Sequence, residues 1–403
     1  MIKLDFIKPT ISFNKNCHYK NYKLGEVLDR VTDPLDPKDD EFYCEIGIKS
    51  HGKGIFYKPL TTKHDIGDKR VFWVKKDLLI LNVVFAWEQA VAKTTENDVG
   101  KIASHRFPMF KPKPAFLDLD YILYFFLTDL GKKLLGIASP GGAGRNKTLG
   151  QKAFDKLSIN LPPIDEQKKI ADFVGAVDKK IQILETKLDT LLSFKKAMLQ
   201  NFIGDNRKEP KWPSVPLKSI LTEKREKNFN ALFSRTEVLS VSGKYGVVNQ
   251  VKHLGRSYAG ESILDYNVVD QYDIVYTRSP LKNNPYGIIK SNKGQPGVVS
   301  KLYAVFECKN STTSTFIENY FELDDNANRY LRPLVHKGAK NSMNISKRRF
   351  LSGYIELPPI EEQKAFNKFK NEIDKKIANL EAQLVSFKKF KLGLLQNLFI
   401  KRS

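Results

Sequence analysis

The sequence predicts an α+β protein with two similar globular halves, each followed by a long helix. The first observation behind this prediction is a repeat: LPPIDEQKKIADF begins at Leu161, and LPPIEEQKAFNKF begins 196 residues later at Leu357. The second is a heptad spacing of apolar residues after each copy, which is typical of coiled-coil helices. The third is a series of short β-type runs before each copy, broken by glycine, asparagine and proline.

The composition favours a folded protein with an anionic partner. The chain has 403 residues, of which 41% are hydrophobic and 11% aromatic, a balance that suits two or three packed domains. Its net charge of +22 indicates nucleic acid, an anionic membrane or an acidic protein as partner. No apolar run reaches the roughly 18 residues of a membrane span, and MIKLDFIKPT does not resemble a signal peptide. Cys17, Cys44 and Cys308 are few, scattered and odd in number, which predicts reduced thiols in a cytoplasmic protein. Nucleic acid is therefore the favoured partner, and no membrane partner is expected.

The repeat defines the expected domains. Residues 161–203 align without a gap with residues 357–399 at the fixed offset of 196, and the same offset pairs Phe154 with Phe350. Nearer the N-terminus the offset falls to 193, where YKLGEVL from Tyr22 matches VPLKSIL from Val215, as loop insertions would produce. We therefore expect globular domains at 1–160 and 206–356, with helical segments at 161–205 and 357–403.

Each globular half contains the same kinds of predicted element. RVFWV and DLLIL in the first half, and DIVYT and KLYAVF in the second, are typical of short strands. A helix is expected over residues 116–136 and ending at Gly136, with a counterpart over residues 315–338. A polar, basic loop follows each helix, SPGGAGRNKTLGQKAF in one half and HKGAKNSMNISKRRF in the other.

The two long helices are expected to pair as a coiled coil. The predicted core is Val177, Ile181, Leu184, Leu188 and Leu191 in the first helix, and Ile373, Ile377, Leu380, Leu384 and Phe387 in the second. Lys195 and Lys391 interrupt the two apolar stripes at the same place in the repeat. Forty helical residues would extend for roughly 60 Å. The alternative, in which each helix packs only on its own domain, stays open from sequence. The helices carry net charges of only +1 and +3, so most of the positive excess lies in the globular halves.

No motif predicts catalysis or metal binding. GGAGRNKT resembles a phosphate-binding loop, but Arg145 and Asn146 separate Gly144 from the Lys147-Thr148 pair. NNPYG resembles the Asn-Pro-Pro-Tyr motif of adenine methyltransferases but lacks the second proline, which favours an ordinary turn. The six histidines show no i,i+4 pair, no Cys-x-x-Cys accompanies them, and no Gly-x-Ser-x-Gly occurs. We therefore expect a non-catalytic protein without a metal site.

The two basic loops are the candidates for contact with nucleic acid. Lysine and arginine neutralise phosphates, small residues let the backbone approach them, and Asn, Arg and Lys also bind base edges. The candidates are Arg145, Asn146, Lys147 and Thr148 in the first half, and Lys340, Asn341, Ser342, Asn344 and Lys347 in the second. The alternative of a solvated loop with ordinary charges stays open, although the loops recur at the same place in both halves.

Over essentially its whole length the chain resembles the DNA-specificity subunits of type I restriction-modification systems. The resemblance rests on the doubled LPPxxEQK followed by a heptad helix, on the helix ends FKKAMLQNF and FKLGLLQNL, and on YKLGEVL, VSGKYGVV and DIVYTR. One departure is KAFNKFKNEI in the second copy, which is more basic than KIADFVGAV in the first. This segment therefore departs from the family pattern of a docking face for a modification subunit.

The resemblance implies a non-catalytic subunit with two target recognition domains, each recognising one half of a split, asymmetric DNA site. It implies that the two helices pair antiparallel and that their length sets the unread spacer. Two modification subunits would methylate adenine N6 with S-adenosylmethionine, and restriction subunits would use ATP and Mg for translocation and cleavage. No cofactor would be bound by this chain itself.

The resemblance also implies which residues contact DNA. The loops around Arg145–Thr148 and Lys340–Asn344 are the main candidates. Weaker candidates lie in Gly-rich turns and after a strand: Lys53, Lys244, Tyr245, Arg278 and Ser279. Other hypotheses are a stand-alone sequence-specific DNA-binding protein, an RNA-processing or nuclease enzyme, and a coiled-coil adaptor without nucleic acid.

Overall fold

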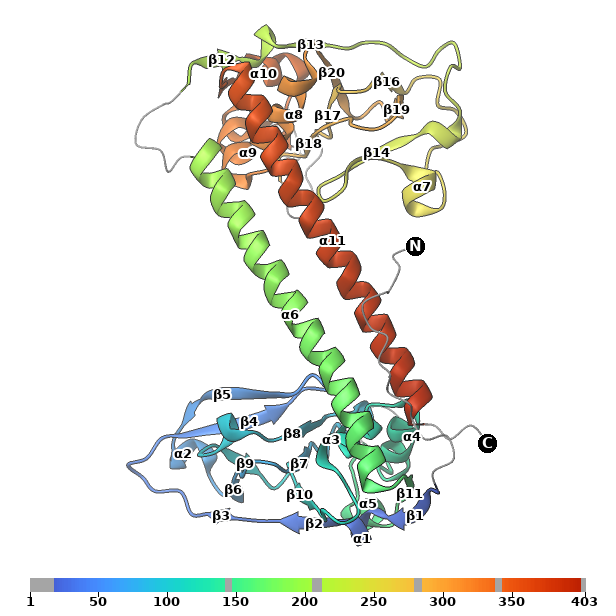
Figure 1. The fold of residues 1–403 in the computed structure, drawn as a ribbon. Helices are drawn as coiled ribbons and strands as arrows, with labels where there is room; N and C mark the ends of the chain where they lie inside the picture. Colours follow the sequence, from blue (N-terminus) through green and yellow to red (C-terminus); the bar gives the residue numbers. More distant parts are fainter. Residues whose placement is uncertain (1–17, 142–146, 205–211, 279–284, 338–342, 400–403) are drawn as a thin grey trace. The chain divides into compact units, whose positions relative to one another are not determined.

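The computed structural model describes residues 18–141, 147–204, 212–278, 285–337 and 343–399 (Figure 1). The chain divides into two compact units. Unit 1 consists of residues 1–185 with 382–403, and unit 2 of residues 186–381. Because both boundaries fall inside long helices, each helix contributes one part to each unit. Among the helices in the described ranges, none combines the length and apolarity that a bilayer span requires.

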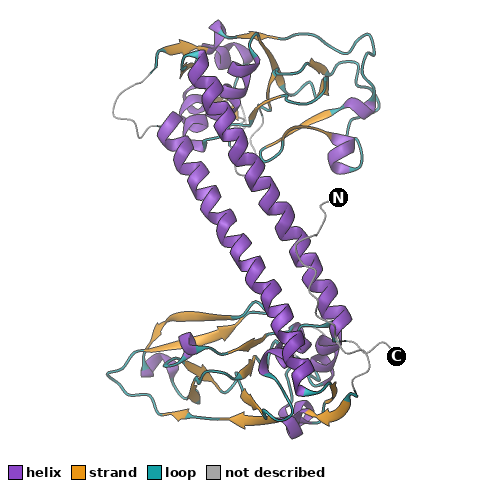
Figure 2. Ribbon diagram, viewed as in Figure 1, coloured by secondary structure: helices purple, strands orange, loops and turns teal. Residues whose placement is uncertain are grey.

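Unit 1 mixes short helices with short strands (Figure 2). Its strands are β1 Lys20–Lys23, β2 Leu28–Val31, β3 Pro34–Leu35, β4 Tyr43–Ile48, β5 Ile55–Thr61, β6 Val71–Trp73, β7 Leu79–Leu81, β8 Val91–Lys93, β9 Ile102–Ser104, β10 Met109–Pro112 and β11 Ser158–Leu161. Its helices are α1 Leu24–Val27, α2 Lys63–Ile66, α3 Leu119–Phe126, α4 Asp129–Ile137, α5 Gln151–Asp155 and the 3-10 turns η1 Ala86–Glu88 and η2 Glu96–Asp98, and the long helix α6 Ile164–Ile203 begins here.

Unit 2 is built from elements of the same kinds. Its strands are β12 Ser214–Pro216, β13 Leu221–Glu223, β14 Leu239–Ser242, β15 Gly246–Asn249, β16 Asn267–Val269, β17 Ile274–Tyr276, β18 Ile289–Ser291, β19 Gly297–Val299, β20 Ala304–Cys308, β21 His336–Lys337, β22 Met343–Asn344 and β23 Tyr354–Glu356. Its helices are α7 Gln250–Leu254, α8 Ser311–Tyr320, α9 Asp324–Leu331, α10 Lys347–Ser352 and the 3-10 turns η3 Leu217–Ser219, η4 Arg235–Glu237 and η5 Arg332–Leu334, and the long helix α11 Ile360–Leu398 begins here.

The two units have matching sheet topologies. The four-stranded sheet runs β2-β10-β7-β8 in unit 1 and β13-β20-β17-β18 in unit 2, and the pairs β1-β11 and β12-β23 also correspond. The five-stranded sheet β3-β6-β9-β4-β5 of unit 1 has a reduced counterpart in the pairs β14-β15 and β16-β19, linked by a parallel bridge between Val238 and Val298. The repeat seen in the sequence is therefore a repeat of the α+β fold.

The cores of the two units use equivalent aromatic side chains. Phe154 of α5 packs on Phe110 of β10, with ring centres 5.1 Å apart, and both side chains are buried. In unit 2 the corresponding Phe350 of α10 stacks on Phe306 of β20 at 4.8 Å. Burying a ring of this size stabilises the fold by about 2–3 kcal/mol. These rings therefore hold α5 and α10, which precede the long helices, against the sheets.

The predicted helix over residues 116–136 is two helices, and its predicted end at Gly136 is wrong. Thr128 interrupts it, because its hydroxyl accepts a hydrogen bond from the Gly131 N–H at 3.0 Å and so caps a new helix, α4. A side chain at Gly131 would come within 2.2 Å of the Phe125 carbonyl oxygen, so the sharp turn requires glycine. Gly136 lies inside α4. The counterpart predicted over residues 315–338 is likewise divided into α8 and α9.

In each unit, a part of α6 lies beside a part of α11 (Figure 1). In unit 1, Phe173 contacts Phe390 with ring centres 6.5 Å apart. In unit 2, Phe194 contacts Phe369 at 6.4 Å. Phe173 and Phe369 occupy the same position in the repeat, as do Phe194 and Phe390. Further along α6 in unit 2, Phe202 stacks on Phe366 at 4.2 Å, so a higher residue number on α6 meets a lower one on α11 there, which is the antiparallel direction.

The repeated Pro-Pro and Gln of the LPPxxEQK motif mark the start of the long helices, where the Gln side chain holds the segment before the helix. The Gln167 side-chain amide donates to the Pro162 carbonyl at 2.9 Å, and Gln363 donates to the Pro358 carbonyl at 2.7 Å. Both glutamines are buried, where an unpaired carbonyl would be costly. Proline needs no backbone donor at a helix start, so the motif is a helix-initiation signal in both halves.

Candidate nucleic-acid interface

The turn between β4 and β5 carries Lys53 at an exposed position in unit 1. Its backbone is held by η1, since the N–H groups of His51 and Gly52 donate to the carbonyls of Glu88 and Gln89 at 2.8 and 3.0 Å. Gly52 has φ +63°, and a side chain there would meet Leu127 at 2.4 Å. The Gly-rich turn is thus fixed against the body of unit 1 while Lys53 stays available to solvent.

Lys147 and Thr148 lie beside the same 3-10 turn. The Lys147 ammonium is 5.2 Å from the centre of the Trp87 ring in η1, within the range of a cation–π interaction. The next residue, Leu149, donates its N–H to the Val83 carbonyl at 2.8 Å. Both Lys53 and the Lys147–Thr148 pair therefore border η1. Arg145 and Asn146 lie outside the described residues.

The exposed strand β5 adds aromatic residues that sequence reasoning missed. Phe56 and Tyr57 are 39% and 48% exposed. Lys49 lies 5.9 Å from the Phe56 ring centre, and Lys101 lies 4.5 Å from that of Tyr57. Exposed rings beside cations suit contact with sugars and bases. The signal that could have found them is the alternation of Lys with Phe and Tyr in KGIFYK.

The corresponding hairpin turn of unit 2, between β14 and β15, carries Lys244 and Tyr245. The Lys244 ammonium contacts the Glu381 carboxylate of α11 at 2.8 Å, and this hydrogen bond raises the pKa of Lys244. The Tyr245 ring is 58% exposed and packs against His253 at 4.8 Å. The weaker candidates Lys53 and Lys244 thus occupy equivalent turns, but Lys244 already has a carboxylate partner.

The remaining candidates of unit 2 are only partly placed. Arg278 follows β17 in the left-handed backbone conformation, with φ +57°. Lys347 begins α10, and its ammonium pairs with the Glu223 carboxylate of β13 at 3.1 Å. A DNA phosphate would therefore have to compete with this carboxylate for the ammonium. Asn344 belongs to the short strand β22, of which the backbone alone is described. Ser279, Lys340, Asn341 and Ser342 lie outside the described residues.

Unit 2 also contains a cavity of about 1130 Å³, lined by both apolar and polar side chains, that sequence reasoning missed. Residues before β14, along β15, in α7 and in the turn before β19 line it. Asn249, Lys252 and Gln295 are among them, and these are side chains that bind base edges or phosphates. No local pattern could reveal this cavity, because its walls come from separate segments spread from Phe233 to Pro296.

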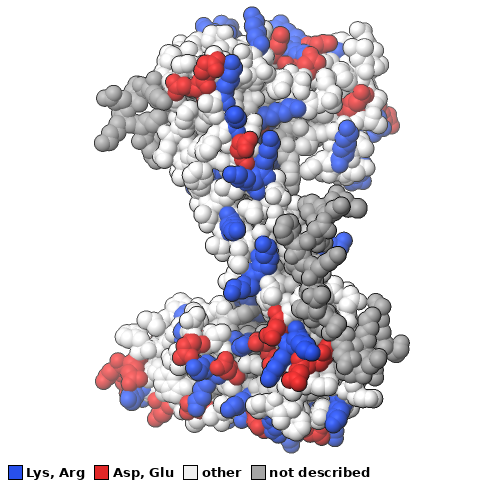
Figure 3. Space-filling view, in the orientation of Figure 1, with Lys and Arg blue, Asp and Glu red and all other residues white. Residues whose placement is uncertain are grey.

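Charges on the visible surface are mixed. In Figure 3, Lys and Arg side chains alternate with Asp and Glu over unit 1. The net charge of +22 therefore does not form one continuous positive field on this face. Contacts to phosphates would depend on particular loops and turns, such as the β4–β5 turn.

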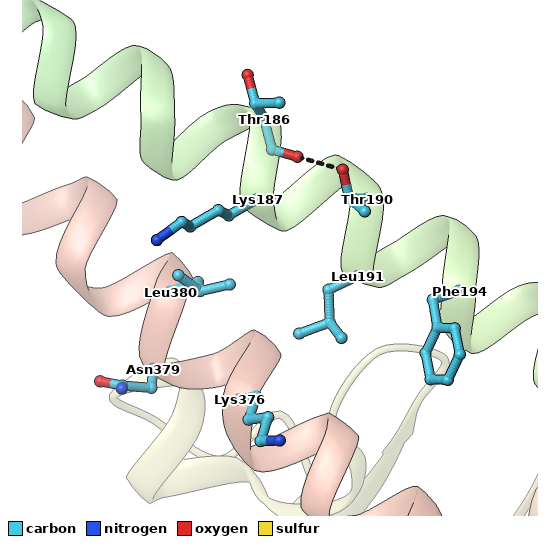
Figure 4. A pocket seen from close by; sticks show the side chains of 8 residues that line it. All are labelled: Thr186, Lys187, Thr190, Leu191, Phe194, Lys376, Asn379 and Leu380. Atoms are coloured by element: carbon cyan, nitrogen blue, oxygen red, sulfur yellow. Dashed lines mark hydrogen bonds between the residues drawn. The ribbon is translucent and has the colours of Figure 1, made fainter.

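The predicted coiled-coil residues divide into two groups by exposure. The buried ones are Val177, Ile181, Leu184, Ile373, Ile377 and Leu384, and the partly buried ones are Leu188, Leu191, Leu380 and Phe387. Within unit 2, Leu191 and Leu380 border a cavity of about 550 Å³ between α6 and α11, together with Phe194 (Figure 4). Nearby, the hydroxyl of the exposed Thr190 donates to the Thr186 carbonyl at 2.9 Å (Figure 4).

Across the described ranges, no group of three or more His, Cys, Asp or Glu side chains is arranged to hold a metal ion.

Comparisons with known proteins agree with this fold. A family model described as the type I restriction modification DNA specificity domain matches residues 17–193. A curated protein of Methanocaldococcus jannaschii, provisionally named type I restriction enzyme MjaX specificity subunit, is 23% identical over 310 residues. That alignment covers 70% of this chain and 69% of the relative.

Two solved structures share the fold. The type I restriction-modification system S subunit from M. genitalium has a TM-score of 0.59 at 12% identity, covering 98% of this chain and 100% of that one. A chain from a structure on complex assembly and conformational transition of the type I R-M system has a TM-score of 0.52 at 14% identity, covering 94% and 97%. At such identities the likeness concerns the fold alone. The family match identifies residues 17–193 as a type I restriction modification DNA specificity domain, and over 70% of its length the chain is similar to a curated type I specificity subunit.

Proposed function

We propose that this chain is the non-catalytic subunit that recognises a bipartite, asymmetric DNA site for a type I restriction-modification complex. Unit 1 and unit 2 would each supply one target recognition domain. The observation that carries the proposal is the repeated fold: two units with one sheet topology present different loops and turns. Two copies of one scaffold with different contact residues suit two different half-sites.

The candidate DNA contacts belong to the loops and turns, and the long helices would separate the two domains. On this proposal the β4–β5 turn with Lys53, the loop at Lys147–Thr148 and the exposed rings of β5 face one half-site. The β14–β15 turn, Arg278 and Lys347 face the other. We further propose that α6 and α11 form one antiparallel coiled coil whose length sets the unread spacer.

The long helices also keep apolar surface that partner subunits could cover. Well-exposed large apolar side chains of these helices include Leu192 43%, Phe194 49%, Phe369 49%, Val385 69% and Leu392 62%. Rows of this kind on a helix pair suit docking of further helices. We propose that two adenine-N6 methyltransferase subunits dock there with their own S-adenosylmethionine, and that restriction subunits with ATP and Mg join them in the cytoplasm.

Co-expression with a candidate modification subunit, followed by mapping of methylated adenines in host DNA, tests the proposal. We expect a stable complex of two modification subunits with one copy of this chain, and methylation at one two-part motif with a fixed spacer. Host DNA from cells that lack the chain is the control. Sequence-specific DNA binding without any complex would favour a stand-alone DNA-binding protein instead.

A second experiment separates the two half-sites. Lys147→Ala should weaken recognition of one half-site, while Lys53→Ala in the same unit should affect the same half. A change in the other half of the motif would contradict the assignment of unit 1 to one half-site. Cleavage of nucleic acid by the purified chain with a divalent metal would contradict the non-catalytic role.

A further inference from the structure

The two lysines that interrupt the heptads form reciprocal ion pairs with the opposite long helix. In unit 1, Lys391 of α11 contacts Asp178 of α6 at 2.6 Å. In unit 2, Lys195 of α6 contacts Asp374 of α11 at 2.7 Å. The two lysines are 196 residues apart in the repeat, and so are the two aspartates. Each helix thus supplies one lysine and one aspartate to the same arrangement.

The numbering of the two pairs gives the same register in both units. From Asp178 to Lys195 is 17 residues along α6, and from Lys391 back to Asp374 is 17 residues along α11. The phenylalanine contacts agree, since Phe173 to Phe194 and Phe390 back to Phe369 are both 21 residues. The apolar and the ionic contacts therefore specify one antiparallel register.

A third group from the globular part joins each pair. The Tyr124 hydroxyl of α3 donates to Asp178 at 3.0 Å in unit 1. In unit 2, Glu322, just after α8, contacts Lys195 at 2.5 Å. Burial would raise the pKa of Glu322, but the ammonium groups of Lys370 and Lys195 outweigh burial and lower that pKa to about 2. Each pair therefore connects α6, α11 and the body of its unit.

Charged groups in these positions favour one register over its neighbours. The side chains of Lys195 and Lys391 are only 17% and 22% exposed. Moving either one away from its aspartate would leave a largely buried ammonium without that partner, which is costly. A slip of one heptad in one direction would bring Asn367 and Ala171 opposite the two lysines. An apolar stripe alone discriminates weakly between registers that differ by one heptad, and a buried polar residue is a known means of selecting one.

A slip in the other direction is excluded by the third groups. It would bring Glu381 and Glu185 opposite the lysines, so new ion pairs could form between the helices. However, Glu322 and Tyr124 belong to the globular parts and in that register would lose Lys195 and Lys391, the latter lying 5.6 Å from the Tyr124 ring centre. Contacts between α6 and α11 alone would permit this slip. The additional contacts of Glu322 and Tyr124 disfavour it.

We propose that the two Lys–Asp pairs, together with Tyr124 and Glu322, determine the register of α6 against α11. They are positioning residues, because they act through the helices and contact no ligand. A second consequence rests on the proposed function: since one heptad changes the position of a helix by about 10 Å, these pairs would also fix the spacer between the half-sites. The spacer would then depend on register as well as on helix length.

The test variant is the full chain with Lys195→Leu and Lys391→Leu. Leucine suits a heptad core, and every carboxylate keeps a partner, because Asp374 still contacts Lys370 at 2.7 Å and Asp178 still accepts from Tyr124. The variant should therefore fold but accept more than one register. The matched control is Lys168→Leu with Lys364→Leu, a pair of exposed lysines at equivalent positions of the same two helices.

Spin labels report the register directly. Cys17, Cys44 and Cys308 are replaced by serine, and labels are attached at Lys179→Cys and Lys375→Cys, which are exposed positions of α6 and α11. We expect one narrow distance distribution for the starting chain and the control, and a second population for the Leu variant, shifted by about 10 Å per heptad. One unchanged narrow distribution in the Leu variant would overturn the inference.

Charge exchange gives a second variant that tests the ion pair itself. Lys391→Asp alone should broaden the distance distribution, because two carboxylates then face each other. Adding Asp178→Lys should restore it, because the Tyr124 hydroxyl can accept from an ammonium as well as donate to a carboxylate. Failure of the exchange to restore the narrow distribution would show that the ion pair does not select the register.

Methylation mapping then separates this inference from the proposed function. If the starting chain directs methylation to a motif with one spacer, the Leu variant should methylate the same two half-sites with more than one spacer. The same single spacer in the Leu variant would refute the consequence for DNA and leave the proposed function intact. Absence of site-specific methylation with the starting chain would refute the proposed function, while the spin-label result would still stand by itself.

Discussion

Units 1 and 2 share one topology but differ where the globular part meets the long helices. Val174 of α6 and Lys370 of α11 occupy the same position in the repeat, and both are almost fully buried. Val174 belongs to an apolar cluster, whereas Lys370 contacts Glu322 and Asp374 at 2.6 and 2.7 Å. The same scaffold therefore accepts an apolar side chain in one unit and an ammonium in the other, provided that the ammonium has carboxylate partners.

The difference explains the basic second copy of the repeat. Asn367 replaces Ala171, and its amide accepts from Asn319 at 2.8 Å and donates to the Thr312 carbonyl at 2.8 Å. Lys370 is likewise turned toward unit 2. The polar residues of KAFNKFKNEI thus serve contacts inside unit 2. The comparison teaches that contacts between the helices are kept in both copies, while contacts from helix to domain are free to diverge.

The largest expected effect comes from breaking the ionic junction of unit 2. Glu322→Ala leaves Lys195 and Lys370 to share Asp374, and removing one member of a buried ionic group costs about 3–5 kcal/mol. In a chain with Trp73→Phe and Trp87→Phe, urea unfolding followed by Trp212 fluorescence measures the free energy of unfolding of unit 2. The complementary variant with Trp212→Phe measures unit 1, which should change little. Equal losses in both units would contradict the comparison.

A pH profile should sharpen the same difference. The pKa of Glu322 is lowered from 4.5 to about 2 in the folded protein, so its stabilisation is present above pH 4.5 and is lost as the pH falls toward 2. A shift of that size corresponds to roughly 3 kcal/mol. Glu322→Leu with Lys370→Val, which copies the valine of unit 1, should flatten the acid dependence of unit 2 and keep its stability at neutral pH. Unfolding followed by Trp212 fluorescence measures the stability of unit 2 at acid and at neutral pH. An unchanged acid dependence would contradict the assignment of this dependence to Glu322.

A smaller difference in stability between the units is expected at the glutamines of the two LPPxxEQK motifs. Gln167 donates to two carbonyls, those of Phe116 and Pro162, and accepts from the Asp118 N–H, whereas Gln363 is seen to donate to the Pro358 carbonyl. Gln167→Ala should therefore destabilise unit 1 by about 2–3 kcal/mol, and Gln363→Ala should destabilise unit 2 by about 1 kcal/mol. The two tryptophan readouts compare them. A larger loss for Gln363→Ala would contradict this order.

The smallest expected effect is at the candidate DNA surface. Lys147→Ala removes a cation–π contact of about 0.5–1 kcal/mol and, under the proposed function, one phosphate contact. DNA affinity of the assembled complex should then depend less steeply on salt, with the log–log slope reduced by about 0.9. Lys347→Ala in unit 2 is the matched comparison. Because Lys347 is already paired with Glu223, we expect a weaker change in slope.

The sequence predicted the long helices well because their signals are local and doubled. The LPPxxEQK motif marks both helix starts within a few residues, since α6 begins at Ile164 and α11 at Ile360. The break at Thr128 was not predicted, because the apolar spacing continues across it and the turn depends on a single hydroxyl and on the small size of Gly131. Periodicity cannot reveal such an interruption when the residues on both sides face the same core.

The candidate site was predicted less completely, for a different physical reason. Lys53 and Lys244 were recognised from glycine-rich turns, and the structure places both in equivalent hairpins. The carboxylates that neutralise Lys244 and Lys347 lie more than 120 residues away in the chain, so no local pattern could have revealed them. The same holds for Lys195 and Lys391: their interruption of the heptads was visible, but their partners depend on how the helices pair.

The division of the long helices also has a consequence for biosynthesis. Leu395 and Phe399, near the end of α11, are buried in the core of unit 1, where Phe399 packs on Tyr121 with ring centres 4.8 Å apart. A ribosome therefore finishes all of unit 2 before it delivers the side chains that close unit 1. Until then the nascent chain exposes an apolar surface, which makes it a candidate for chaperone binding. A chain that stopped before Leu395 would therefore leave the core of unit 1 incomplete.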